Sequence, residues 1–158
     1  MRISMTRAAY LLDRKIGYDL VTHPATMRSS GSAKKGHVPS SRLAKAVVLK
    51  GTAGYLLAVL PASHRIQIAE LRALLGDNVD LANEEQIETL FGDCERGAVP
   101  AIGAAYGLKV VMDDSLANEP DVYFEGGDHA SLVHVSGANF RSLMAGAKSG
   151  RFREGNRA

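Results

Sequence analysis

The sequence predicts a single α+β domain built around a mixed β-sheet. The chain has 158 residues, of which 46% are hydrophobic and 23% charged. This length and composition suffice for one compact domain with its own core, but the chain is too short to expect two domains. Predicted strands occur both as an adjacent hairpin and as separated segments, and predicted helices fall between them irregularly. This order favours an α+β architecture over a regular repeat of strand, helix and strand.

The first third of the chain predicts a helix, a strand, a loop and a hairpin. Apolar residues at helical spacing end at Gly17, and the alternating strand that follows ends at Pro24. Ser, Gly, Lys and Pro then dominate, which is typical of a loop around a short helical turn. The predicted order is a helix over 6–15, a strand over 18–24, a loop over 25–41 and a hairpin made of "RLAKAVVLKG" and "YLLAVLP".

The rest of the chain predicts helices and strands in alternation, followed by a tail. Gly76 is placed to end one helix, and Asn83 is placed to cap the next, with Glu84 and Glu85 in its first turn. The predicted order is a helix over 66–76, a strand over 79–82, a helix from 83, a Gly-rich loop over 97–103, strands over 109–114, 121–127 and 131–137, and a closing helix over 137–147. Residues 1–148 form the predicted domain, and residues 149–158 form a basic tail that we expect to be flexible.

Composition excludes several classes of protein. The single cysteine, Cys94, allows no internal disulfide and no multi-cysteine zinc site, which fits a reducing, cytoplasmic setting. Two carboxylates flank Cys94 and would raise its thiol pKa, so a nucleophilic role is not expected. No segment has the length of a membrane span, and the first residues lack the core of a signal peptide. The histidines show no metal-ligand spacing, so no metal is expected.

The common sequence signatures of catalysis and cofactor binding are also absent. The chain has no GxGxxG after a strand, no GxxxxGK[ST], no HExxH and no GxSxG. We therefore expect no nucleotide cofactor. The formal net charge is only +2, which permits contact with a polyanion but does not indicate a dedicated DNA-binding surface.

Lys45 is the most informative charged residue, because it lies among apolar residues of a predicted strand. A lysine beside a core commonly extends its ammonium group to solvent while its aliphatic stem packs, and that is the ordinary interpretation. The other interpretation is that the ammonium group serves a site. The residues around Lys45 alone do not decide between the two.

An ordered set of segments resembles a known family. The segments are "VTHP", "RLAKAVVLK", "LAVLPASHRI", "LANEEQIETLFGDCERGAVPAIG", "VVMDDSL" and "VYFEGGDH". Together, over residues 18–145, they resemble the YbaK/prolyl-tRNA synthetase-associated domain, the family of free-standing trans-editing aminoacyl-tRNA deacylases. The resemblance implies a central mixed, barrel-like β-sheet flanked by helices. It also implies a pocket that hydrolyses the ester between a wrong amino acid and a tRNA 3′ end.

The resemblance assigns a functional role to Lys45. The family's lysine is thought to bind and orient the aminoacyl-adenosine while the ribose 2′-hydroxyl helps to activate water. In chemical terms the ammonium group can stabilise the charge that develops on the ester carbonyl oxygen, or it can hold the phosphate of the terminal adenosine. Thr22 and His23, in "VTHP", match a segment that borders the pocket.

The loop "RGAVPAIG" resembles the family's Gly-x-x-x-Pro loop. Glycines let the backbone approach a ligand closely and present N–H groups to an oxyanion. Counted from Gly97, the expected proline position holds Ala101, and Pro100 stands one residue earlier. This departure bears on the rigidity of the loop and on the size of amino acid that it admits. The alternative is a simple connection between a helix and a strand. The predicted substrate-binding residues here are Gly97, Ala98, Val99, Pro100, Ala101, Ile102 and Gly103.

The segment "EGGDH" resembles the family's Gly-rich pocket wall and predicts substrate contacts from Gly127, Asp128 and His129. The ordinary pKa of histidine suits a general base at neutral pH. A histidine next to an aspartate is more often a structural pair, so we assign His129 a supporting role.

The resemblance implies a mischarged tRNA, recognised mainly at its acceptor end, as the substrate. Family members act by subgroup, for example on tRNA for proline that carries Ala or Cys. Lys34, Lys35 and the basic tail are candidates for further contacts, and an aminoacyl-tRNA synthetase is a candidate partner. A second hypothesis is a binding module that holds aminoacyl-tRNA or a nucleotide-like ligand without hydrolysing it, because a shared fold does not fix activity.

Overall fold

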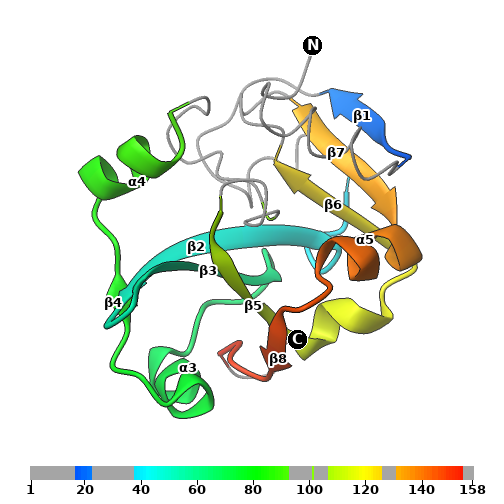
Figure 1. Cartoon of the computed structure of the whole chain (residues 1–158). Helices are drawn as coiled ribbons and strands as arrows, with labels where there is room; N and C mark the ends of the chain where they lie inside the picture. The colour runs from blue at the N-terminus through cyan, green and yellow to red at the C-terminus, as the bar shows by residue number, and fades with distance from the viewer. Residues whose placement is uncertain (1–16, 23–37, 93–100, 102–106, 126–130, 155–158) are drawn as a thin grey trace.

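A computed structural model describes residues 17–22, 38–92, 101, 107–125 and 131–154 of the chain (Figure 1). Its centre is an eight-stranded sheet in the order β1-β7-β6-β2-β3-β5-β8, with β4 paired to β2. The strands are β1 (Asp19–Thr22), β2 (Leu43–Gly51), β3 (Gly54–Pro61), β4 (Asp80–Leu81), β5 (Lys109–Asp113), β6 (Asp121–Glu125), β7 (Ser131–Ser136) and β8 (Lys148–Gly150). The helices are α3 (Ile68–Leu75), α4 (Glu84–Leu90), α5 (Gly137–Leu143) and the 3₁₀ helix η2 (Asp114–Asn118).

The sheet is mixed, as the sequence predicts. β2 and β3 form the predicted antiparallel hairpin, and Gly54 at its turn has a φ of 121°, a conformation that favours glycine. β6 pairs with β7 and β1 with β7 in antiparallel fashion. β2 with β6, β3 with β5 and β5 with β8 are parallel pairs. In Figure 1 the long β2 crosses the middle of the molecule, with α3 beneath the hairpin and α5 beside β6.

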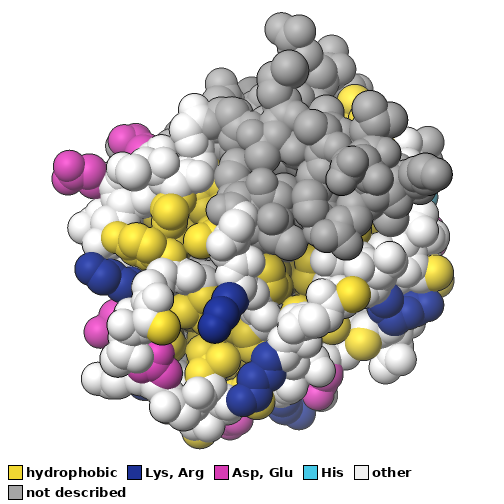
Figure 2. Space-filling model, in the orientation of Figure 1, with side chains coloured by type: hydrophobic (Ala, Val, Ile, Leu, Met, Phe, Trp, Pro, Cys, Tyr) yellow, Lys and Arg dark blue, Asp and Glu magenta, His cyan; other side chains and the backbone are white. Residues whose placement is uncertain are grey.

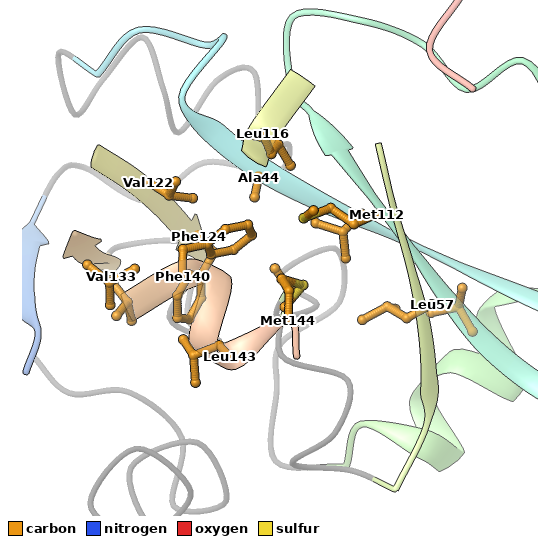
Figure 3. Packing of buried hydrophobic residues seen from close by; sticks show 14 of the residues in the cluster. Ala44, Leu57, Met112, Leu116, Val122, Phe124, Val133, Phe140, Leu143 and Met144 are labelled. Atoms are coloured by element: carbon orange, nitrogen blue, oxygen red, sulfur yellow. The ribbon is translucent and has the colours of Figure 1, made fainter. Parts of the chain in front are cut away.

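The two faces of β2 contact different parts of the core. Alternate residues Ala44 and Val48 pack into the larger apolar cluster, in which Phe124, Phe140 and Met144 lie close together (Figure 3). The intervening residues lie on the other face, where Leu49 joins the smaller cluster, which includes Leu71 of α3. Both faces of the hairpin are therefore covered, which explains its nearly continuous apolar sequence.

The predicted helix ends are confirmed at α3 and α4. Gly76 follows α3 in the left-handed conformation, with φ 63° and ψ 31°, and its N–H bonds to the carbonyl of Arg72. Asn83 caps α4 in a reciprocal box: its side chain accepts from the N–H of Gln86, and the Gln86 side chain accepts from the N–H of Asn83. The helix η2 is a difference from the sequence-based expectation, which extended the preceding strand to Asp114.

The expected flexible tail is wrong for residues 149–154. Residues 148–150 form β8, which pairs in parallel with β5, and Phe152 has no exposed surface. Burial of this one aromatic ring and the parallel pairing order a segment whose composition is otherwise polar. The predicted helix over 6–15 and the loop over 25–37 lie outside the described residues. Within the described part, no helix is both long and apolar enough to cross a membrane.

Candidate functional site

Lys45 lies near the start of β2, on the face opposite the larger core cluster. It pairs with Leu60 of β3 and shares a face with Val47 and Leu49, because alternate residues of a strand point the same way. Its side chain is half-buried. Burial lowers the pKa of the Lys45 ammonium group below its usual value, and the positive charge of Arg65 lowers it further. Lys45 is therefore a partly desolvated cation next to a second cation.

The strand register brings other predicted site segments to the same end of the sheet. Thr22, the last residue of β1, pairs with Ser131, the first residue of β7. Glu125, the last residue of β6, pairs with Leu132 of β7. In the parallel pairing of β2 with β6, Ala44 aligns with Phe124, so Lys45 and Glu125 are the next residues of these two neighbouring strands. β1 and β6 therefore both finish at this end of the sheet, and the predicted site segments follow them directly in the sequence.

Glu125 is a candidate functional residue that the sequence-based argument did not select. Its side chain is 1% exposed, which is rare for a carboxylate. It lies one residue before the predicted pocket wall and on the Lys45 face, since it alternates with the core residue Phe124. A charged residue that ends an apolar strand, as in "VYFEGG", is the sequence signal that could have identified it.

The structure describes only part of the predicted substrate-binding set. Ala101 is fully buried and packs in the larger core cluster with Ala44, Val48 and Phe124. Its methyl group is thus a core contact on the face of β2 that Lys45 does not share. Contact of the loop backbone with a substrate remains a prediction. The remaining predicted residues lie outside the described residues: His23, Gly97, Ala98, Val99, Pro100, Ile102, Gly103, Gly127, Asp128 and His129.

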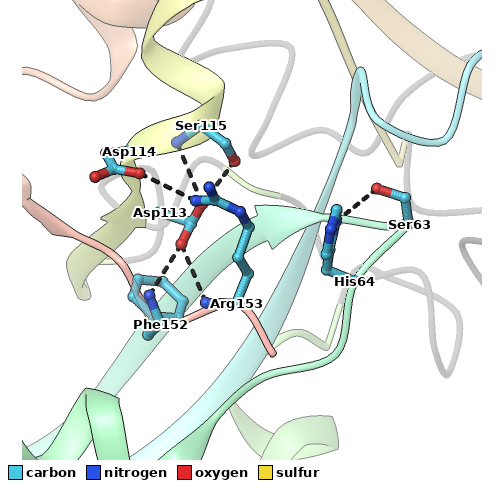
Figure 4. A network of polar contacts seen from close by, with 7 residues as sticks. All are labelled: Ser63, His64, Asp113, Asp114, Ser115, Phe152 and Arg153. Carbon is cyan, nitrogen blue, oxygen red and sulfur yellow. Dashed lines mark hydrogen bonds and ion pairs between the residues drawn. The ribbon is translucent and has the colours of Figure 1, made fainter. Parts of the chain in front are cut away.

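A cavity of about 370 Å³ lies beyond the end of β3, lined among the described residues by Ser63, His64, Arg65 and Glu154. Ser63 Oγ and His64 Nδ1 are 2.9 Å apart and share a hydrogen bond (Figure 4). The other ring nitrogen of His64 is enclosed and has no hydrogen-bond partner within the described part of the chain. This cavity is not predictable from local sequence, because its described lining residues come from two distant segments.

A buried carboxylate fixes the C-terminal wall of this cavity. Asp113 is 0% exposed, and its carboxylate accepts hydrogen bonds from the backbone N–H groups of Phe152 and Arg153 at 3.0 and 3.1 Å. It also accepts from the Ser115 hydroxyl at 2.6 Å and from the Arg153 guanidinium at 2.8 Å (Figure 4). Burial opposes ionisation of Asp113, but these hydrogen bonds outweigh it and lower its pKa.

The charged side chains of the described residues form no large patch of one sign on the face that Figure 2 shows. On the face shown in Figure 2, basic and acidic side chains of the described residues are interspersed among apolar ones. Within the described part of the chain, no three His, Cys, Asp or Glu side chains are grouped as metal ligands. The distinctive electrostatic feature near the candidate site is therefore the neighbouring Lys45 and Arg65.

Comparison with solved structures shows a shared fold. A candidate trans-editing enzyme for prolyl tRNA synthetase matches with a TM-score of 0.80 at 25% identity, over 95% of this chain and 96% of that one. The hypothetical protein APE2540 matches with a TM-score of 0.82 at 23% identity, over 94% and 99%. A scaffold protein used for epitope backbone grafting matches with a TM-score of 0.80 at 21% identity, over 96% of both chains.

A search of curated proteins found no match. The model of the aminoacyl-tRNA editing domain family, in contrast, matches residues 23–143, most of the chain. This span contains Lys45, the Gly-rich loop and the end of β6, and the solved structures above share its fold. The chain belongs to the aminoacyl-tRNA editing domain family.

Proposed function

We propose that this protein is an aminoacyl-tRNA deacylase that hydrolyses the ester of a mischarged tRNA in trans. Membership of the editing-domain family supports this class of reaction. A structural neighbour described as a candidate trans-editing enzyme for prolyl tRNA synthetase supports action as a separate chain. The substrate that we propose is tRNA for proline carrying Ala, Cys or another small amino acid.

The observation that carries this proposal is the position of Lys45. Its side chain is half-buried on β2, at the end of the sheet where β1 and β6 finish and the predicted pocket segments follow in the sequence. A solvated surface lysine would show neither the burial nor the lowered pKa. A cation in partly desolvated surroundings acts on a developing negative charge more strongly than the same cation in water.

In the proposed reaction, water attacks the ester carbonyl carbon and the negative charge moves to the carbonyl oxygen. Lys45 stabilises that oxygen by a charge-assisted hydrogen bond. The tetrahedral intermediate then breaks its bond to the ribose oxygen, which takes up a proton and leaves as the tRNA hydroxyl, and the amino acid is released. The predicted residues Thr22 and His23, the loop Gly97–Gly103 and the segment Gly127–His129 would position the aminoacyl group.

The test is hydrolysis of a panel of mischarged tRNAs, led by Ala-, Cys- and Ser-tRNA for proline. We expect the wild type to release at least one of these amino acids and Lys45→Ala to lose roughly a hundredfold or more in rate, as when one oxyanion donor is removed. Lys50→Ala is the matched control, because Lys50 lies on the same strand with an exposed side chain. It should retain the wild-type rate.

Two results of this test would contradict part of the proposal. If the wild type cleaves no ester of the panel but binds aminoacyl-tRNA, the deacylase proposal fails for these substrates and a binding module is the better interpretation. If it cleaves an ester and Lys45→Ala cleaves it equally well, the reaction stands and the role assigned to Lys45 is wrong.

A further inference from the structure

The cavity lined by Ser63, His64, Arg65 and Glu154 lies beyond the end of β3, the strand that pairs with the strand of Lys45. Its first three residues follow the end of β3, where Leu60 pairs with Lys45. The segment that follows β3 is held against the start of β2, because the N–H of Ala62 donates a hydrogen bond to the carbonyl of Leu43 at 2.8 Å. The effect of the Arg65 charge on the pKa of Lys45 is consistent with this proximity.

The walls of the cavity are held by backbone hydrogen bonds between two distant segments. The N–H of Glu154 donates to the carbonyl of Arg65 at 2.6 Å, and the N–H of Gln67 donates to the carbonyl of Phe152 at 2.6 Å. The Asp113 carboxylate fixes the same C-terminal segment from the other side (Figure 4). A cavity with fixed walls loses little conformational entropy when it binds a ligand.

The polar groups of the cavity suit a ligand that has both an anionic group and a hydroxyl group. Arg65 is exposed and forms no ion pair within the described part of the chain, and the same holds for Glu154. The cation and the carboxylate line one cavity without neutralising each other. Arginine binds phosphate by charge-assisted hydrogen bonds, whereas a carboxylate accepts a hydrogen bond from a hydroxyl. The volume of about 370 Å³ is within the range of about 300–1,000 Å³ typical of small-ligand sites.

We propose that this cavity binds the nucleotide that precedes the aminoacylated terminal nucleoside of the tRNA, with Arg65 on its phosphate and Glu154 on its ribose 2′-hydroxyl. The proposal rests on the proposed function, which places the terminal nucleoside at Lys45. It gives a reason for a second cation close to Lys45, because the phosphodiester that Arg65 would bind carries a negative charge. A contact to the 2′-hydroxyl also distinguishes RNA from DNA.

The first experiment compares two substrates with the same ester at pH 7: the aminoacyl-tRNA and aminoacyl-adenosine, which lacks the preceding nucleotide. We expect Arg65→Ala to lower kcat/KM for the aminoacyl-tRNA roughly tenfold to a hundredfold, as for a lost hydrogen bond to a charged group. The same variant should lower kcat/KM for aminoacyl-adenosine much less, because this substrate lacks the phosphate that Arg65 would bind. Lys109→Ala, which removes an exposed positive charge at the start of β5, should affect neither substrate.

Two outcomes overturn the assignment of Arg65. Equal kcat/KM of Arg65→Ala and wild type on the aminoacyl-tRNA shows that Arg65 does not contact it, and an equal loss on both substrates shows that Arg65 acts at Lys45 instead. If the wild type hydrolyses neither substrate, the proposed function fails, and anisotropy titration of an uncharged RNA trinucleotide with the tRNA 3′ sequence tests the cavity separately. Equal affinity of Arg65→Ala and wild type for this trinucleotide overturns the proposal.

The second experiment tests Glu154 with a 2′-deoxy substitution at the nucleotide before the terminal one. The wild type should bind the substituted trinucleotide several-fold more weakly than the all-ribose one. Glu154→Gln should bind the two with a smaller difference, because the ionised acceptor is gone. An unchanged difference in the variant would contradict a contact between Glu154 and this hydroxyl.

Discussion

At the scale of single residues, burial distinguishes the candidate functional groups from ionisable groups that are solvated. Lys45 and Lys50 lie on one strand, but Lys50 is exposed whereas Lys45 is half-buried, and burial lowers the pKa of Lys45. Sequence patterns identify Lys45 as unusual because it interrupts an apolar strand. They do not identify Glu125, because a glutamate is ordinarily exposed, and its burial depends on strands that are distant in the sequence.

The buried Asp113 carboxylate leads to a prediction about the stability of the folded protein. Replacing it by Asn removes the charge that opposes Arg153, a half-buried cation. We expect Asp113→Asn to lower the free energy of unfolding at pH 7 by about 3 kcal/mol, the lower end for a broken buried pair, because Arg153 keeps its contact with Asp114. Asp114→Asn, the exposed control, should cost less than about 1 kcal/mol. Urea unfolding of the three proteins measures both effects.

The pH dependence of this effect has a definite sign. The pKa of Asp113 is lower in the folded protein than its ordinary value of 3.8, so the folded state favours the charged carboxylate. Its contribution to stability is therefore complete above about pH 3.8 and is lost as the pH falls through the lower folded value. The stability difference between wild type and Asp113→Asn should narrow in that acidic range. A difference that stays constant from pH 7 to pH 2 would contradict the role assigned to the carboxylate.

At the scale of elements, local signals set the ends of helices and turns. The ends of α3, α4 and the β2–β3 hairpin were predictable because Gly76, Asn83 and the Gly-containing turn act through their own backbone and side chains. β8 was not predictable. The residues Lys-Ser-Gly carry no strand pattern, and they form a strand only because the edge of β5 is available for pairing.

The cap of α4 gives a prediction for an element. Asn83→Ala removes the acceptor for the N–H of Gln86 at 2.8 Å and breaks the reciprocal box. We expect a loss of about 1 kcal/mol in the free energy of unfolding, the usual cost of an N-cap. Asn78→Ala, at an exposed position outside any helix, is the control and should change stability little. Equal stability of the two variants in urea would show that the box does not support α4.

At the scale of the whole molecule, the order of the strands determines the candidate site. Thr22, Lys45 and Glu125 are separated by long stretches of sequence, and the pairings of β1 with β7, β7 with β6 and β6 with β2 bring them to one end of the sheet. Composition and periodicity predict the mixed sheet and most of its elements. They do not predict these long-range pairings, nor the cavity that the ends of β3 and of the C-terminal segment form together.

The C-terminal segment supplies the last prediction, which tests where the domain ends. Residues 149–154 complete β8 and include the fully buried Phe152. The backbone N–H of Phe152 also donates a hydrogen bond to the Asp113 carboxylate. A protein ending at Lys148 loses an aromatic side chain worth about 3–5 kcal/mol by comparison with Phe→Ala substitutions in cores, and it leaves Asp113 buried without Arg153. We expect it to be largely unfolded at 37 °C, whereas a protein ending at Glu154 should melt close to the full-length chain. Circular dichroism melts of the two truncated proteins decide the matter, because equal melting temperatures would place the end of the domain at residue 148.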